Sequence, residues 1–252
     1  MSEKMQVPTE IIDLPSKGLL YSSENPLSEG KVEMKYMTAK EEDILTNVNL
    51  LKQGLAMEKV MKSLIKSPID YSTLLLGDRN ALLIATRILS YGKVYSFKFR
   101  NPNTDLEEVI DYDLQNIGFK EIDYSLLSDK NEFSFTLPHS KTDLTFKLLT
   151  VGDSKKMEEE IKGLKKSLGF EPGELTTRLK YQITSVNGDR STKTIREFVD
   201  GDYLLAMDSR ELRKEIAKVT PDIDTIITFK TSDGEEHVID LPLGIDFFFP
   251  GS

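Results

Sequence analysis

The chain has 252 residues, with 42 acidic side chains against 33 basic ones, a formal net charge of −9, no cysteine and two histidines. This composition excludes a disulfide framework, a thiolate metal site and a cysteine nucleophile, and it argues against a histidine-rich metal centre. Residues 101–252 carry 30 acidic and 19 basic side chains, which disfavours broad contact with nucleic-acid phosphates.

The first predicted segment, residues 1–36, is a turn-rich arm followed by a strand. Pro15-Ser16-Lys17-Gly18 is typical of a turn, because proline fixes φ and glycine permits a positive φ. Apolar and charged residues then alternate over residues 31–36. This period of two predicts a half-exposed strand.

The second predicted segment, residues 37–118, is a helical block that ends in a hairpin. Thr38 and Glu41 have the spacing of a capping box and predict a helix start. Gly92 is placed to end the last helix of the block, which begins near Asp70 or Ser72 with a break at Gly77. The predicted elements are helices over 38–48, 57–66 and 72–91 and strands over 94–99 and 108–114.

The third predicted segment, residues 119–252, contains a β segment, a second helical block, a second hairpin and an aromatic tail. Asp208 or Ser209 is expected to cap the last helix, and Pro221 to stop it. The predicted elements are strands over 132–137 and 145–150, helices over 153–168, 175–186, 191–199, 203–207 and 208–219, and strands over 225–230 and 236–241.

The predicted fold class is α+β, with helical blocks that are each followed by a β-hairpin. The second hairpin repeats features of the first, since both contain a Phe-Lys pair and later a Glu-Glu pair and a Val-Ile-Asp run. Two modules of this type would give a pseudo-duplicated chain. The alternative is that such short strings recur by chance in an acidic protein.

No catalytic, cofactor-binding or metal-binding motif stands out. The chain has no phosphate-binding glycine loop and no HExxH string, and the spacing of its carboxylates does not single out an acid–base pair. No apolar run approaches the roughly 20 residues of a membrane helix, and the first ten residues lack the apolar core of a signal peptide. We therefore expect a soluble cytosolic protein.

Three charged residues, Asp78, Arg79 and Arg87, interrupt an otherwise apolar predicted helix. Such groups most often pair with carboxylates at the edge of a core. That pairing is our expectation, and a role in an interface is the alternative.

Two apolar segments, the arm around Leu14 to Gly18 and the aromatic tail from Phe247 to Pro250, are candidates for contact with a partner protein. Each segment either folds back onto the core or anchors a partner. For the tail the reason is that exposed phenylalanines would form an apolar patch. Both alternatives stay open for the arm and for the tail. With the three charged residues above, the candidates are Leu14, Pro15, Lys17, Gly18, Tyr21, Phe247, Phe248, Phe249 and Pro250.

A series of short motifs, in this order, resembles the T4-type bacteriophage baseplate protein family, and the match spans almost the whole chain. That family includes the baseplate hub subunit and the hub assembly catalyst of T4-like phages. The motifs are Leu14-Pro-Ser-Lys-Gly18 with Tyr21, Gly30-Lys-Val, Met37-Thr-Ala-Lys-Glu-Glu42, Leu76-Gly-Asp-Arg79, Leu82-Leu83, Arg87, Ser90-Tyr-Gly92 and the final Phe-Phe-Phe-Pro.

The resemblance implies a hub assembly factor or hub component that is not an enzyme and acts by protein–protein binding in the host cytoplasm during tail assembly. The first alternative is a structural subunit that stays in the virion baseplate. The partners would be other baseplate hub or tail proteins, with no nucleic acid, membrane, small-molecule substrate or cofactor, and a homo-oligomer is left open. Alternatives from other classes are a generic cytosolic adaptor and a carboxylate-dependent tail hydrolase.

Some members of the family carry cysteine pairs at the two hairpins. This chain has Phe99-Arg-Asn-Pro102 and Thr231-Ser-Asp-Gly234 in their place. If these positions correspond, the resemblance implies that side-chain packing holds the hairpins.

Overall fold

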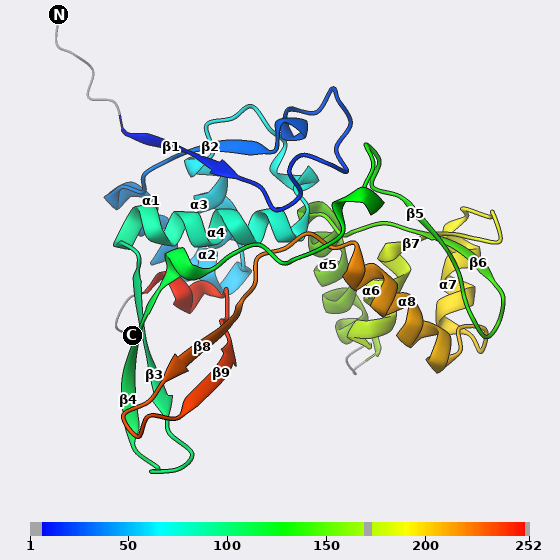
Figure 1. The fold of residues 1–252 in the computed structure, drawn as a ribbon. Helices are drawn as coiled ribbons and strands as arrows, with labels where there is room; N and C mark the ends of the chain where they lie inside the picture. Colours follow the sequence, from blue (N-terminus) through cyan, green and yellow to red (C-terminus); the bar gives the residue numbers. More distant parts are fainter. Residues whose placement is uncertain (1–6, 169–172, 250–252) are drawn as a thin grey trace, which may run out of the picture.

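The computed structural model describes residues 7–168 and 173–249, and helices and small antiparallel sheets alternate along this part of the chain (Figure 1). The α+β prediction is confirmed. The helices are α1 (Ala39–Leu45), α2 (Val48–Gln53), α3 (Ala56–Leu64), α4 (Leu76–Tyr91), α5 (Val151–Leu168), α6 (Glu174–Gln182), α7 (Thr192–Asp200) and α8 (Ala206–Lys218).

The strands form four antiparallel sheets. β1–β2, β3–β4 and β8–β9 are two-stranded, and β5–β6–β7 is three-stranded in that order. Hairpins β3–β4 and β8–β9 each follow a helical block, as predicted. The strands are β1 (Thr9–Asp13), β2 (Lys31–Lys35), β3 (Val94–Arg100), β4 (Glu107–Asp113), β5 (Phe133–Thr136), β6 (Asp143–Phe146), β7 (Ile183–Val186), β8 (Ile226–Lys230) and β9 (Glu236–Asp240).

The elements gather in two lobes, which Figure 1 shows side by side. The first lobe holds β1 to β4 and α1 to α4, and the second holds β5 to β7 and α5 to α8. The end of the chain returns to the first lobe, where β8–β9 lies against β3–β4. Phe229 on β8 makes edge contacts with Phe97 and Phe99 on β3, at ring-centroid distances of 5.3 and 5.0 Å. The boundaries of the three predicted segments stay a prediction.

The chain crosses between the lobes on two connectors that run antiparallel. The amide of Asp224 donates to the Gly118 carbonyl, and the amide of Lys120 donates to the Asp222 carbonyl, each at 2.8 Å. Gly77 of helix α4 packs directly on the second of these connectors, which leads from α8 back to the first lobe and contains Pro221. A Cβ at this position would collide with the carbonyl oxygen of Pro221, so only glycine allows this approach.

We expect Gly77→Ala to lower the free energy of unfolding by about 1–3 kcal/mol, the usual cost of overpacking a close contact. The matched control is Gly163→Ala on the exposed side of α5, where an added Cβ meets nothing within 4 Å. That change should raise the free energy of unfolding by up to about 1 kcal/mol through helix propensity. Urea denaturation measures both, and equal effects would contradict the close approach.

Several predicted elements are corrected. The helix expected over 175–186 ends at Gln182, because residues 183–186 leave it to pair with β6 as strand β7. No helix covers 203–205 within the described residues, since α8 begins at Ala206. Asp208 does not cap α8, because its carboxylate accepts the amide hydrogens of His139 and Ser140 at 2.9 Å.

Other boundaries also differ from the prediction. Helix α4 begins at Leu76 and contains Gly77 without a break, and a short 3₁₀ turn, Tyr71–Thr73, precedes it. The strand expected over 145–150 ends at Phe146, and α2 was not predicted. The capping box is confirmed, since Glu41 accepts hydrogen bonds from the amide and the hydroxyl of Thr38 at 3.0 and 2.6 Å.

In the second lobe, Glu160 on α5 is the centre of a charged network with α6 and α7. Arg196 donates to both of its oxygens at 2.8 and 2.6 Å, and the Tyr181 hydroxyl donates at 3.0 Å. The hydrogen bonds from Arg196 lower the pKa of Glu160 most, burial opposes them and Tyr181 adds to them, so the pKa is about 2.

The lowered pKa of Glu160 makes the stability depend on pH. A carboxylate with a depressed folded-state pKa stabilises the fold above its unfolded pKa, and that contribution is lost as the pH falls toward 2. We expect Glu160→Gln to destabilise the protein at pH 7 and to have progressively less effect between about pH 4.5 and pH 2. Thermal unfolding over this range measures the difference. The control, Glu158→Gln, changes an exposed carboxylate 3.9 Å from Lys162 and should have a small effect at pH 7.

Candidate partner-binding surfaces

The arm around the Pro15 turn is fastened to the start of α4 by a buried carboxylate. Asp78 accepts a hydrogen bond from the amide of Ser16 at 2.9 Å and another from the Tyr21 hydroxyl at 2.6 Å. The Tyr21 oxygen in turn accepts the amide hydrogen of Leu75 at 2.9 Å. Burial raises the pKa of Asp78, while the hydrogen bonds from Tyr21 and Ser16 oppose that rise.

The predicted arm residues therefore contact their own chain. Leu14, Pro15 and Tyr21 are buried, and Gly18 has a φ of +81° that suits glycine. Lys17 is exposed, and its ammonium lies 3.6 Å from the ring centroid of Tyr124. A partner could reach the three buried residues only by displacing the arm.

The aromatic tail is held in the same way on the first lobe. Phe247 and Phe248 are almost fully buried, and Phe247 lies 5.0 Å from Tyr95 between ring centroids. Arg87 donates from Nε to the Phe247 carbonyl and from Nη1 to the Gly92 carbonyl, both at 3.2 Å. The tail is therefore docked on the core of the first lobe.

The remaining tail residues are placed only in part. Phe249 packs partly buried against the same core. Pro250 lies outside the described residues.

The expectation that these charged residues pair with carboxylates at the edge of a core is wrong, since Asp78, Arg79 and Arg87 make no ion pair within residues 7–168 and 173–249. Asp78 and Arg87 use hydrogen bonds to backbone and hydroxyl groups instead. Arg79 donates from Nη2 to the Asn80 side chain at 3.1 Å, and its buried Nε has no hydrogen-bond partner.

The tips of the two hairpins are joined by a polar network. Asn101 donates from Nδ2 to Glu108 at 3.0 Å and to Asp233 at 3.2 Å. The amide of Ser232 donates to the other oxygen of Glu108 at 2.8 Å. Hydrogen bonds at the tips and aromatic contacts behind them therefore hold the hairpins together. No cluster of three or more metal-ligating side chains occurs in the part of the chain that the structure describes.

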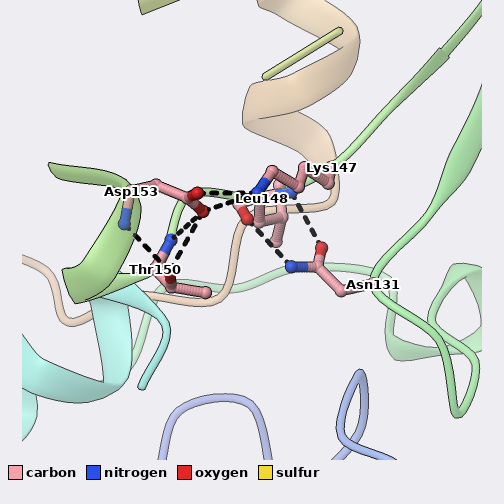
Figure 2. A network of polar contacts seen from close by, with 5 residues as sticks. All are labelled: Asn131, Lys147, Leu148, Thr150 and Asp153. Atoms are coloured by element: carbon pink, nitrogen blue, oxygen red, sulfur yellow. Dashed lines mark hydrogen bonds and ion pairs between the residues drawn. The ribbon is translucent and has the colours of Figure 1, made fainter. Parts of the chain in front are cut away.

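A second polar network fixes the start of α5, as Figure 2 shows. The ammonium of Lys147 lies 2.7 and 2.8 Å from the two oxygens of Asp153. Thr150 donates to Asp153 from its amide and its hydroxyl, and Asn131 bonds both the amide and the carbonyl of Leu148 at 2.8 Å. These donors and acceptors satisfy one another, so the network forms a hydrogen-bonded joint at the start of α5.

This joint also connects the lobes. The amide of Val151 donates to the Leu74 carbonyl at 2.8 Å, and the amide of Leu76 donates to the Leu149 carbonyl at 3.1 Å. The N-termini of α4 and α5 are thereby fixed relative to each other.

Three exposed apolar residues, close together in the sequence around the start of α8, were not recognised as exposed in the sequence analysis. Tyr203 is 68% exposed, Met207 is 60% exposed, and Leu205 lies between them with its side chain also exposed. Exposed groups of this kind are a common signature of protein–protein contact. The run was interpreted as part of a helix, so its exposure could not be recognised from the sequence.

The described helices include none that has both the length and the apolar character to cross a membrane. A family model described as T4 bacteriophage base plate protein matches residues 13–250. Comparison with curated proteins and with solved structures finds no match.

Proposed function

The chain belongs to the T4 bacteriophage base plate protein family, and we propose from this that it is a hub assembly factor or hub component in tail morphogenesis. It acts by binding other tail or base plate proteins in the host cytoplasm. The observation that carries the proposal is the family match, which covers residues 13–250.

The exposed surface supports a binding role. The cluster of Tyr203, Leu205 and Met207 offers an aromatic and aliphatic anchor in one short segment. Interfaces draw most of their binding energy from a few such residues. The arm and the tail contribute indirectly, because they hold the first lobe in shape.

The pKa shifts and the burial of the carboxyl groups favour a binding role over catalysis. A hydrolase that uses paired carboxylates needs one of them with a raised pKa in an accessible pocket. Among the described carboxyl groups with a shifted pKa, only that of Asp78 is raised. Asp78 is fully buried and engaged by Ser16 and Tyr21, so it is not available to a substrate.

Quantitative mass spectrometry of purified virions and of tail intermediates from infected cells tests the proposal. Presence in the intermediates and absence from virions identifies an assembly factor. A fixed copy number in virions identifies a structural subunit of the hub. Absence from both fractions would overturn the proposal and favour a cytosolic adaptor.

A further inference from the structure

A cavity of about 410 Å³ lies between the lobes, where α3 and α4 face α5. Its walls combine apolar side chains with polar and charged ones. Leu55, Leu83 and Leu243 supply apolar surface, and Tyr71, Arg79 and Lys155 supply donors.

Arg79 brings an unused donor to this cavity. Its Nε is buried and has no hydrogen-bond partner, and the guanidinium makes no ion pair with any described carboxylate. Its one hydrogen bond to a side chain runs from Nη2 to Asn80 at 3.1 Å. A buried donor without a partner costs free energy, so an acceptor placed here is stabilised.

Tyr71 provides a second donor in the same cavity. The residue is 5% exposed, and its hydroxyl makes no hydrogen bond with the described residues. Burial raises the pKa of Tyr71 to about 12, with smaller effects from the charges of Arg79 and Glu58, so the hydroxyl keeps its proton at neutral pH. The lining of the cavity therefore includes two residues that carry hydrogen-bond donors, one cationic and one neutral.

The Glu58 carboxylate of the lining is already engaged by lysines. Glu58 is held by Lys62 at 2.7 Å and by Lys155 at 3.3 Å. At the rim, the exposed Glu158 faces Lys162 at 3.9 Å. Glu159, the third carboxylate of the lining, is exposed and makes no ion pair with a described residue, and the guanidinium of Arg79 makes none either.

We propose that this cavity binds an acidic side chain of a partner protein, with the carboxylate between Arg79 and Tyr71. The planar guanidinium matches a carboxylate better than other acceptors, because two N–H groups can meet its two oxygens. The methylene stem of the acidic residue would lie on Leu55 and Leu243. This inference rests on the proposed function in one respect, namely that the partner is a protein of the phage tail.

The test uses the full ¹⁵N-labelled chain and the probe N-acetyl-glutamate methylamide in an NMR titration. We expect saturable shifts of the Arg79 Nε–H signal and of the amides at Leu55 and Lys155. The uncharged N-acetyl-glutamine methylamide should produce none. Shifts of equal size with both probes, or no shift with either, would overturn the proposal, and equal or tighter binding of inorganic phosphate would assign the site to anions in general.

Two variants make the test specific. Arg79→Gln should weaken probe binding about tenfold or more, and Tyr71→Phe about threefold, read from the amide signals. The matched control Arg100→Gln removes an exposed arginine paired with Asp105 and should leave binding unchanged. Unchanged affinity in Arg79→Gln, with the amide spectrum otherwise preserved, would contradict the assignment.

Failure of this inference can be distinguished from failure of the proposed function. If the probe does not bind while the chain still co-purifies with base plate proteins, this inference alone fails. If the probe binds and no tail protein co-purifies, the cavity is a carboxylate site and the proposed function fails.

Discussion

Replacing Asp78 with alanine is expected to lower the free energy of unfolding by roughly 2–6 kcal/mol, since each buried donor left without an acceptor costs about 1–3 kcal/mol and two donors are affected. The variant leaves the Ser16 amide and the Tyr21 hydroxyl buried without an acceptor. Both groups belong to the arm, so the arm should detach from α4 before the rest of the lobe unfolds.

Urea denaturation gives the stability change, and amide hydrogen exchange at Ser16 and Leu75 reports whether the arm has opened. The matched control is Asp13→Ala, which removes an exposed carboxylate 3.7 Å from Lys31 and should change stability by less than about 1 kcal/mol. Equal effects of the two substitutions would show that the arm is not fastened through Asp78.

Replacing Phe248 with alanine should also cost roughly 3–5 kcal/mol, because the ring is completely buried in the first lobe and its removal leaves a cavity. Truncation after Asp246 should cost more. It also removes Phe247 and the carbonyl that accepts the hydrogen bond of Arg87.

The control for the tail is Val238→Ala on β9, since that side chain is 62% exposed and should contribute little to stability. Thermal unfolding followed by circular dichroism measures all three variants. A truncated chain that melts at the wild-type temperature would contradict docking of the tail on the core. Any loss of partner binding in the truncated chain has to be judged against this melting temperature.

The elements that could be predicted from the sequence are those set by neighbouring residues. The capping box of Thr38 and Glu41 and the alternation that predicted β2 act within a few positions, and both are confirmed. The hairpins also follow from local alternation and turn residues. The family was recognised from short motifs in the right order, and the family match confirms it.

The elements that could not be predicted depend on distant partners. Residues 183–186 leave the helical path because strand β6, some 40 residues earlier, pairs with them. Asp78 meets Ser16 across 62 residues, so its acceptor role could not be read from the helix that carries it. The unpaired donor of Arg79 could not be predicted either, because the cavity that this residue lines is formed by residues of α3, α4 and α5, which lie far apart in the sequence.

The most direct test of the central claim is quantitative mass spectrometry of the proteins that co-purify with the tagged full-length chain from infected cells. If the chain works by binding in base plate assembly, we expect base plate or tail proteins to be enriched in a constant ratio over an untagged control. Recovery of the folded chain alone, or with host proteins only, would contradict the claim.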